Sequence, residues 1–302
     1  MSSGPPPLAK PELPDGVAAA RAAAAVEVLP PWKAWTAPAA VVLGLALGSI
    51  GDLLVSIGGA ASGANLSHPP PAVNIVGDVV FDLGFVAAAI YLASLQGRVR
   101  PSDFGFRQTG LGRGIRIVVL AAIAYYLATA AYASLLGLHG SEQLPSGLGG
   151  TSDTAAMIGV GVFVTVIAPI CEEFFFRGFL FGVLRTWLAQ RAWGPWVAAI
   201  AVGIVFGAAH LGSASPKYLV PLGFLGFILC IVRWKSGSLY PGMALHSINN
   251  SLALGVDELH WDAAKIIALA VVALAAIAAI AGPLGAREPA VGVDRRGAVE
   301  SR

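Results

Sequence analysis

The fold of this chain is decided by one apolar stretch, residues 160–184, which reads VGVFVTVIAPICEEFFFRGFLFGVL. A bilayer-crossing helix takes about 20 apolar residues, so this stretch is long enough to span a membrane. It nevertheless holds two adjacent carboxylates, Glu172 and Glu173, and a guanidinium, Arg177. A charge at the bilayer centre costs about 2.5–3.5 kcal/mol on insertion scales, so such residues are rare and usually functional. The stretch therefore predicts a membrane helix that carries a functional site.

The composition indicates an integral membrane protein. Of the 302 residues, 56% are hydrophobic and 12% are charged, whereas soluble domains carry about 25% charged residues. The net charge of +2 carries little information as a total. The two cysteines, Cys171 and Cys230, lie in apolar segments and form neither a disulfide framework nor a metal-ligand spacing.

Eight apolar stretches are candidates for membrane spans: roughly 38–61, 73–95, 115–137, 156–184, 195–213, 218–234, 240–257 and 264–283. They predict an all-α, polytopic bundle of about eight transmembrane helices over residues 36–284. Residues 1–35 are rich in Pro, Ala and Gly and lack the apolar core of a signal peptide. This segment and the polar tail, residues 285–302, are predicted to be disordered.

The distribution of Lys and Arg predicts the orientation of the bundle. These residues gather in the N-terminal segment, in the second, fourth and sixth connections and in the tail, while the first and third connections have none. Cytoplasmic segments carry the excess of positive charge, so both termini are expected to be cytoplasmic. The predicted setting is the lipid bilayer of a prokaryotic plasma membrane, with no nucleic-acid partner.

Helix geometry separates the roles of the two glutamates. Glu173 and Arg177 are four residues apart, which places them on one face and favours an ion pair. Glu172 is rotated by about 100° from Glu173 and has no cation at that spacing, so it is the candidate general base. Pro169, one turn earlier, is expected to kink the helix and to free a backbone carbonyl.

Two histidines lie in later predicted spans. His210 follows Phe206 by four residues in the fifth, and His246 precedes Asn250 by four residues in the seventh. Residues with this spacing share a helix face. Because isolated polar groups are costly in lipid, we expect Glu172, His210, His246 and Asn250 to gather around one polar cavity.

Three motifs in this order, Glu172-Glu173-x-x-x-Arg177, Phe206-x-x-x-His210 and His246-x-x-x-Asn250, carry a family resemblance. The chain resembles the CAAX-protease and bacteriocin-processing family, also called type II CAAX prenyl endopeptidases, which are glutamic intramembrane proteases. The segments 100–105 and 238–242 are similar to that family too. The resemblance covers about residues 100–257, and the motif positions show no departure.

The resemblance implies a role for each motif residue. Glu172 and His210 would activate the attacking water, and His246 and Asn250 would stabilise the oxyanion. Glu173, Arg177 and Phe206 would support the site. It also implies an intramembrane endopeptidase without metal or other cofactor, acting on a peptide or membrane-protein segment such as a prenylated C-terminus.

Three alternatives stay open on the sequence. A zinc site could use Glu and His, although no HExxH-type pair is present. A cysteine protease could use Cys171 with His210, although a thiol in an apolar helix is a poor nucleophile. A non-enzymatic transporter, immunity factor or scaffold could use the same polar cluster, with Asp52, Asp78 and Asp82 as additional intramembrane acids. No inverted repeat of the kind found in transporters is visible.

Overall fold

The computed structural model describes residues 29–137 and 154–285. Within these residues the regular elements are helices, with one isolated bridge between Leu211 and Ala214. In that part of the chain, six helices are long and apolar enough to cross a membrane. They are α2 (Thr36–Ala61), α3 (Pro71–Ser94), α5 (Leu111–Leu136), a composite helix over Thr154–Trp187, α11 (Pro216–Ser236) and α13 (Ala263–Ala281) with η4 (Gly282–Leu284). The predicted all-α membrane fold is confirmed.

Two further helices are shorter than a full span. They are α10 (Gly194–Ala209) and α12 (Tyr240–Ala253), which continues as η3 (Leu254–Glu258). The eight predicted stretches thus correspond to eight helical segments, of which six have a spanning length and composition. The predicted fifth stretch was too long at its end: α10 stops at Ala209, and the chain turns at Gly212, whose φ is +98°.

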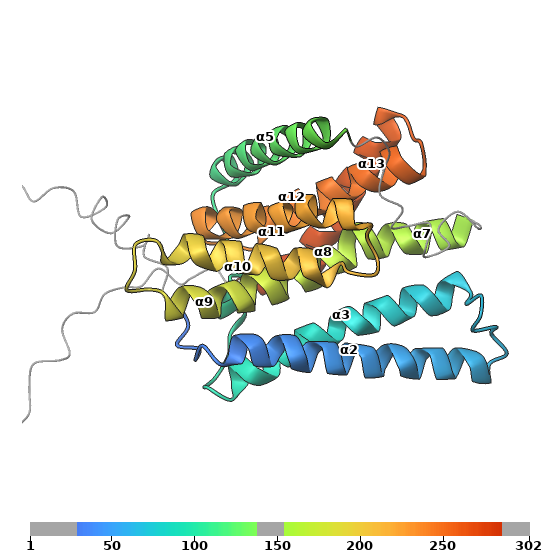
Figure 1. Cartoon of the computed structure of the whole chain (residues 1–302), viewed down its shortest axis with the longest axis horizontal. Coiled ribbons are helices and arrows are strands. Elements are labelled where there is room, and N and C mark those ends of the chain that lie inside the picture. Colours follow the sequence, from blue (N-terminus) through green and yellow to red (C-terminus); the bar gives the residue numbers. More distant parts are fainter. Residues whose placement is uncertain (1–28, 138–153, 286–302) are drawn as a thin grey trace, which may run out of the picture.

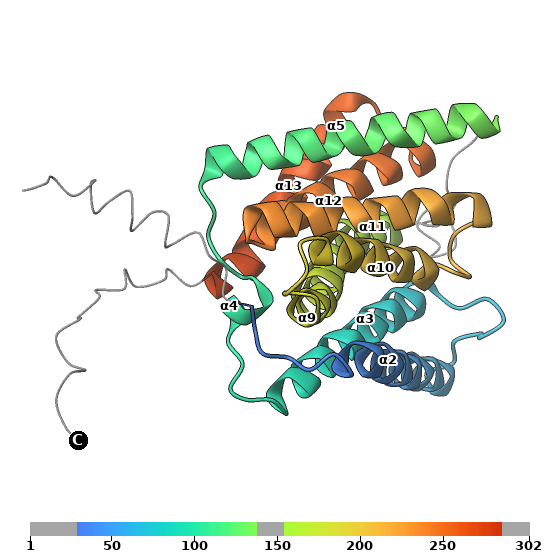
Figure 2. The ribbon, with the colours of Figure 1, turned by 60° about the vertical axis from the view of Figure 1, so that its left-hand side comes forward.

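The helices pack as a bundle with a hairpin at one side (Figures 1 and 2). Helices α2 and α3 lie side by side and form that hairpin, while α5 lies at the opposite edge. Glycines bring α10 and α11 close together: a Cβ at Gly203 would lie 2.7 Å from the Gly223 carbonyl oxygen, and one at Gly207 would lie 2.8 Å from that of Leu219. Small residues at such contacts let backbones approach, as is typical of membrane helices.

The helix that holds the glutamates is not a regular α-helix. It runs through α7 (Thr154–Val162), the π-helical η1 (Phe163–Ile167), α8 (Ala168–Glu172), the π-helical η2 (Glu173–Leu180) and α9 (Phe181–Trp187). Pro169 lies in the first turn of α8, directly after the first π segment. Proline removes one backbone donor, and π turns are often found at functional sites. The two π-helical segments therefore lie on either side of α8, which ends at Glu172, and Glu173 is the first residue of the second segment.

The bundle begins earlier than predicted. Of the predicted disordered segment 1–35, residues 1–28 lie outside the described residues, as does the tail from residue 286. The remaining part is packed: Trp32 is 4% exposed, and its ring lies 4.9 Å from that of Phe104 and 5.0 Å from that of Phe179. A buried aromatic ring contributes a large apolar contact area, so the packed bundle includes Trp32, which the predicted boundary at residue 36 had left out.

Candidate active site

Glu173 and Arg177 form the ion pair that their spacing predicts. Arg177 Nη1 lies 2.9 Å from Glu173 Oε1, and both side chains are 0% exposed. The guanidinium also donates from Nη2 to the Gly226 carbonyl at 3.3 Å and lies 4.3 Å from the centre of the Phe206 ring. The positive charge is therefore held between a carboxylate, a carbonyl and an aromatic face, each of which stabilises a desolvated cation.

His246 lies between the two glutamates. Its Nδ1 is 3.1 Å from Glu173 Oε1, and its Nε2 is 3.7 Å from Glu172 Oε2. Because the Glu173 carboxylate is an acceptor that Arg177 also contacts, the hydrogen of this bond is assigned to Nδ1. A separation of 3.7 Å is too long for a hydrogen bond. Glu172 Oε2 therefore keeps the capacity to accept a proton from another group.

Pro169 explains how α12 attaches to this helix. In a regular α-helix the Thr165 carbonyl would accept the N–H of residue 169, but proline has none. Instead, Ser247 Oγ donates to the Thr165 carbonyl at 2.6 Å, and Asn250 Nδ2 donates to the Val164 carbonyl at 2.8 Å. The predicted release of a backbone carbonyl is confirmed. An amide group has two N–H donors, so Asn250 keeps a second one for another acceptor.

His210 lies at the end of α10 and not inside a membrane helix, which corrects the prediction from the sequence. It is the C-cap residue of α10, and its Nδ1 lies 2.8 Å from the Phe206 carbonyl. The Phe206 ring separates the two histidines: its centre is 4.9 Å from that of His210 and 5.8 Å from that of His246. Within the described residues, no hydrogen bond or ion pair joins His210 to Glu172. The direct contacts bring together the two glutamates, Arg177 and His246, and Phe206 links them to His210.

Gly242 and Ser247 contribute to the site but were not singled out from the sequence. A Cβ at Gly242 would lie 2.6 Å from Glu173 Oε2, so the glycine leaves space for this carboxylate. Gly242 precedes His246 by four residues and therefore shares its helix face. That spacing is the signal that could have identified it. For Ser247 the only available signal is its position next to His246.

Replacement of Gly242 by Ala is expected to destabilise the protein. The new methyl group would be forced against Glu173 Oε2, and overpacking of this kind typically costs about 1–3 kcal/mol. Thermal unfolding in detergent measures this effect. Gly161→Ala is the matched control, because a Cβ there meets nothing within 4 Å. A Gly242→Ala protein as stable as the Gly161→Ala protein would contradict the close packing of α12 on Glu173.

The segment 100–105, which carries part of the resemblance, packs against the π-helical turn of the glutamates. It forms the short helix α4 (Pro101–Phe104), and the Phe104 ring lies 4.5 Å from that of Phe174 in η2. Gly105 has a φ of +104°, and its carbonyl accepts the N–H of Leu239 at 2.9 Å. This bond connects the segment to the start of α12, so the segment helps to set the position of His246 relative to the glutamates.

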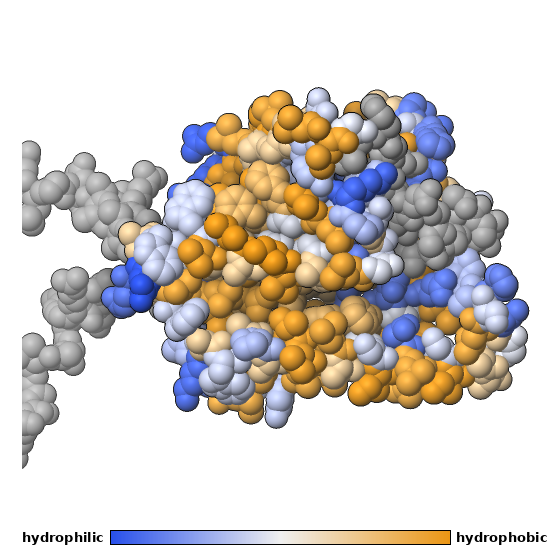
Figure 3. Space-filling view, in the orientation of Figure 1, coloured by the Kyte–Doolittle hydropathy of each residue, from blue (hydrophilic) through white to orange (hydrophobic). Residues whose placement is uncertain are grey.

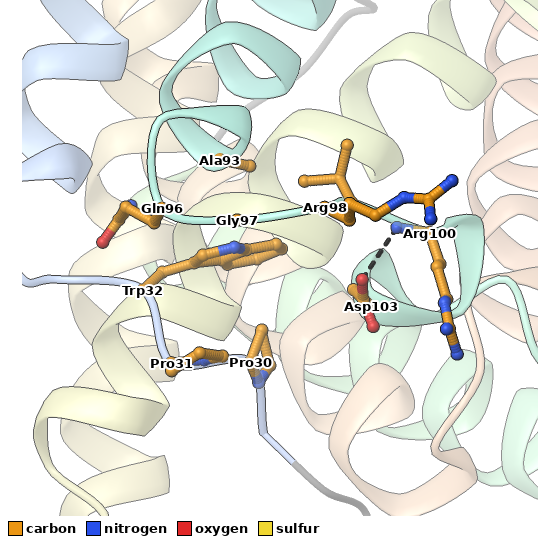
Figure 4. A pocket seen from close by; sticks show the side chains of 10 residues that line it. Pro30, Pro31, Trp32, Ala93, Gln96, Gly97, Arg98, Arg100 and Asp103 are labelled. Carbon is orange, nitrogen blue, oxygen red and sulfur yellow. Dashed lines mark hydrogen bonds between the residues drawn. The ribbon is translucent and has the colours of Figure 1, made fainter.

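A cavity of about 260 Å³ lies at a different place, beside Trp32 and the end of α3 (Figure 4). Gln96, Arg98, Arg100 and Asp103 contribute to its lining, and none of the predicted site residues does. Figure 4 shows the guanidinium groups of Arg98 and Arg100 pointing in different directions. The carboxylate of Asp103 accepts the backbone N–H of Arg100 at 2.8 Å. Because none of the predicted site residues lines this cavity, it is not the candidate active site.

The ligands that the zinc and cysteine alternatives need are not assembled in the described part of the chain. There, no group of three or more His, Cys, Asp and Glu side chains has the geometry to hold a metal ion. Cys171 and Cys230 are both buried free thiols. His210 Nδ1 lies 2.8 Å from the Phe206 carbonyl oxygen, and no hydrogen bond between His210 and Cys171 is found among the described residues.

Comparison with known proteins agrees with the motifs. Residues 154–252 match the family model described as type II CAAX prenyl endopeptidase Rce1-like, and this range includes all three motifs. An uncharacterized 24.3 kDa protein of Escherichia coli is 31% identical over 91 residues, which cover 30% of this chain and 41% of that protein. The chain thus matches less than half the length of this relative. No solved structure matches. Residues 154–252 are thus similar to the type II CAAX prenyl endopeptidase Rce1-like family.

Proposed function

We propose that this chain is an intramembrane endopeptidase in which Glu172 activates a water molecule to hydrolyse a peptide bond. The observation that carries the proposal is the position of His246 between Glu172 and the Glu173–Arg177 ion pair. Glu172 is 20% exposed, whereas Glu173 and Arg177 are 0% exposed. Water and substrate can therefore reach the Glu172 side chain, whereas the Glu173–Arg177 ion pair stays buried beside His246.

In the proposed reaction, the Glu172 carboxylate accepts a proton from water as the water oxygen bonds to the carbonyl carbon. The C–N bond then breaks, and the leaving nitrogen takes the proton back from Glu172. The second amide N–H of Asn250 and the Nε2 of His246 stabilise the oxyanion. His246 Nδ1 lies 3.1 Å from Glu173 Oε1 and Nε2 lies on the side of Glu172, so Nε2 is the ring nitrogen proposed to contact the oxyanion. We assign His210 to a second contact with the water.

The proposed substrate is a peptide or a segment of a membrane protein, with a prenylated C-terminus as one class to test. The experiment uses the purified protein in lipid vesicles with a peptide library that contains prenylated and unprenylated members. Cleavage products are identified by mass spectrometry. We expect cleavage by the natural protein and none by the Glu172→Ala protein. Equal cleavage by both proteins would contradict the proposal.

Activity is expected to be independent of metal ions, because the proposed nucleophile is activated by a carboxylate. Dialysis against a chelator should leave turnover unchanged, and added zinc should not increase it. The measurement is turnover before and after dialysis, together with the metal content of the protein. Stoichiometric zinc whose removal abolishes turnover would favour the metalloprotease alternative.

The non-enzymatic alternative is favoured by one observation, the three aspartates of the α2–α3 hairpin. Asp52 lies on α2, and Asp78 and Asp82 lie one helical turn apart on α3. Carboxylates within membrane helices are typical of proton-coupled transport. A transporter would move its solute in vesicles without releasing any cleaved peptide, so the vesicle assay above separates the two functions.

A further inference from the structure

Tyr126 of α5 is joined to the candidate active site by a chain of hydrogen bonds. Its hydroxyl donates to Oδ1 of Asn249 on α12 at 3.1 Å, and Asn249 Nδ2 donates to Oδ1 of Asn250 at 3.4 Å. Asn250 Nδ2 in turn donates to the Val164 carbonyl at 2.8 Å. The chain therefore runs from α5 through two adjacent amides to the π-helical η1. Neither Tyr126 nor Asn249 has a role in the hydrolysis described above.

The carbonyl at the end of this chain sets the direction of every bond in it. A backbone carbonyl only accepts, so the Asn250 amide presents its N–H to Val164 and its Oδ1 to Asn249. That oxygen needs a donor, which makes Nδ2 the Asn249 atom that faces it. Asn249 Oδ1 then accepts from the Tyr126 hydroxyl. The Asn250 amide is therefore held at both ends, at its nitrogen by Val164 and at its oxygen by Asn249.

The bond between the two asparagines affects the N–H group that Asn250 has left over. Neighbouring residues on a helix point about 100° apart, which accounts for the length of this bond, 3.4 Å. A hydrogen bond accepted by an amide oxygen polarises the amide and strengthens the bonds that its N–H groups donate. The second N–H of Asn250, the one assigned to the oxyanion, is thus fixed in direction and made a stronger donor.

Tyr126 reaches Asn249 from a helix whose surface is otherwise mainly apolar. Four residues of α5 are 49–67% exposed, namely Val119, Leu120, Ile123 and Leu127, and Figure 3 shows hydrophobic residues over this helix. The Tyr126 ring lies 5.1 Å from that of Tyr125 and packs on the apolar cluster between α5 and α11. Because these contacts hold the ring, removal of the hydroxyl alone leaves the packing of α5 in place.

We propose that Asn249 and Tyr126 are positioning residues of the endopeptidase, which orient the Asn250 amide toward the oxyanion. Asn249 acts on Asn250 directly, and Tyr126 acts through Asn249. Helix α5 thereby takes part in the reaction, since the direction of a donor on α12 depends on a hydroxyl group of α5. The positioning role rests on the proposed endopeptidase function, whereas the hydrogen-bond chain does not.

Steady-state kinetics of the full-length protein in lipid vesicles, with the peptide that the library assay identifies, test the positioning role. Tyr126→Phe removes one hydrogen bond, so kcat is expected to fall about two- to tenfold. KM should stay unchanged, because the oxyanion forms only in the transition state. Asn249→Leu should lower kcat about tenfold to a hundredfold, the range in which a misplaced group acts. In the Asn249→Leu protein, Tyr126→Phe should cause no further fall.

Tyr132→Phe is the matched control. The Tyr132 hydroxyl, also on α5, donates to the Lys217 carbonyl of α11 at 3.2 Å, so this variant loses an interhelical bond of the same kind that does not lead to Asn250. Its kcat and KM should equal those of the natural protein. Equal kcat for the Tyr126→Phe and Tyr132→Phe proteins would overturn the positioning role and leave the endopeptidase standing, as would a rise in KM in place of the fall in kcat.

The unfolding temperature in detergent measures the hydrogen-bond chain without any substrate. Residues of one network give non-additive changes in stability, so the decrease for the double variant of Tyr126 and Asn249 should be smaller than the sum of the two single decreases. Additive decreases would overturn the chain. A natural protein that cleaves no peptide would contradict the endopeptidase and the positioning role, while non-additive decreases would leave the chain standing. If Asn249→Leu does not fold, the comparison of Tyr126→Phe with Tyr132→Phe still decides the effect on kcat.

Discussion

Replacement of Glu172 by Gln is expected to lower turnover by about a hundredfold or more, since general acid–base groups contribute about 10²–10⁴ to the rate. The amide keeps the shape of the side chain but cannot take a proton from water. The folded state should be little affected, because His246 Nε2 lies 3.7 Å from Glu172 Oε2, too far for a hydrogen bond that the substitution would break. Turnover in vesicles and thermal unfolding in detergent measure the two effects.

Comparing the Glu172→Gln protein with the Glu173→Gln protein shows which of the two carboxylates acts as the base. If the Glu172→Gln protein retains near-normal turnover while the Glu173→Gln protein is folded but inactive, the roles of the two glutamates are reversed. If both variants are folded and active, neither carboxylate is the base, and the proposed mechanism is wrong.

Replacement of Glu173 by Gln is expected to destabilise the fold. It leaves Arg177 as a buried cation without its carboxylate, and breaking a buried ion pair typically costs about 3–5 kcal/mol. His246 Nδ1 would lose its charged acceptor as well. We expect a lower folded yield, a lower unfolding temperature and reduced turnover. The double replacement Glu173→Gln with Arg177→Met should recover part of the stability, because the unpaired charge is then absent.

The chain contains a matched control for this pair. Lys265 and Asp262 form an ion pair of 3.2 Å at the start of α13, with side chains 62% and 60% exposed. Exposed ion pairs contribute only about 0–1 kcal/mol, so Lys265→Met should change the unfolding temperature little. If Glu173→Gln proves no more destabilising than Lys265→Met, the buried pair does not have the structural role assigned to it.

The sequence predicted the helices well because the patterns that define them are local. Each predicted stretch is a run of apolar residues, and the run ends where polar or turn residues begin. The errors lie at ends that tertiary contacts decide. Trp32 extends the bundle toward the N-terminus because it packs on Phe104 and Phe179. The early end of α10 places His210 in a turn instead of a membrane helix.

Within a single helix, the sequence by itself determined the site. The spacing of Glu173 and Arg177 dictated their ion pair, and Pro169 dictated a free carbonyl, because both follow from helix geometry and covalent structure. Contacts between helices depend on how the helices pack, and no spacing along the chain encodes them. Only the tertiary structure placed His246 between the two glutamates and bonded Ser247 and Asn250 to the Thr165 and Val164 carbonyls.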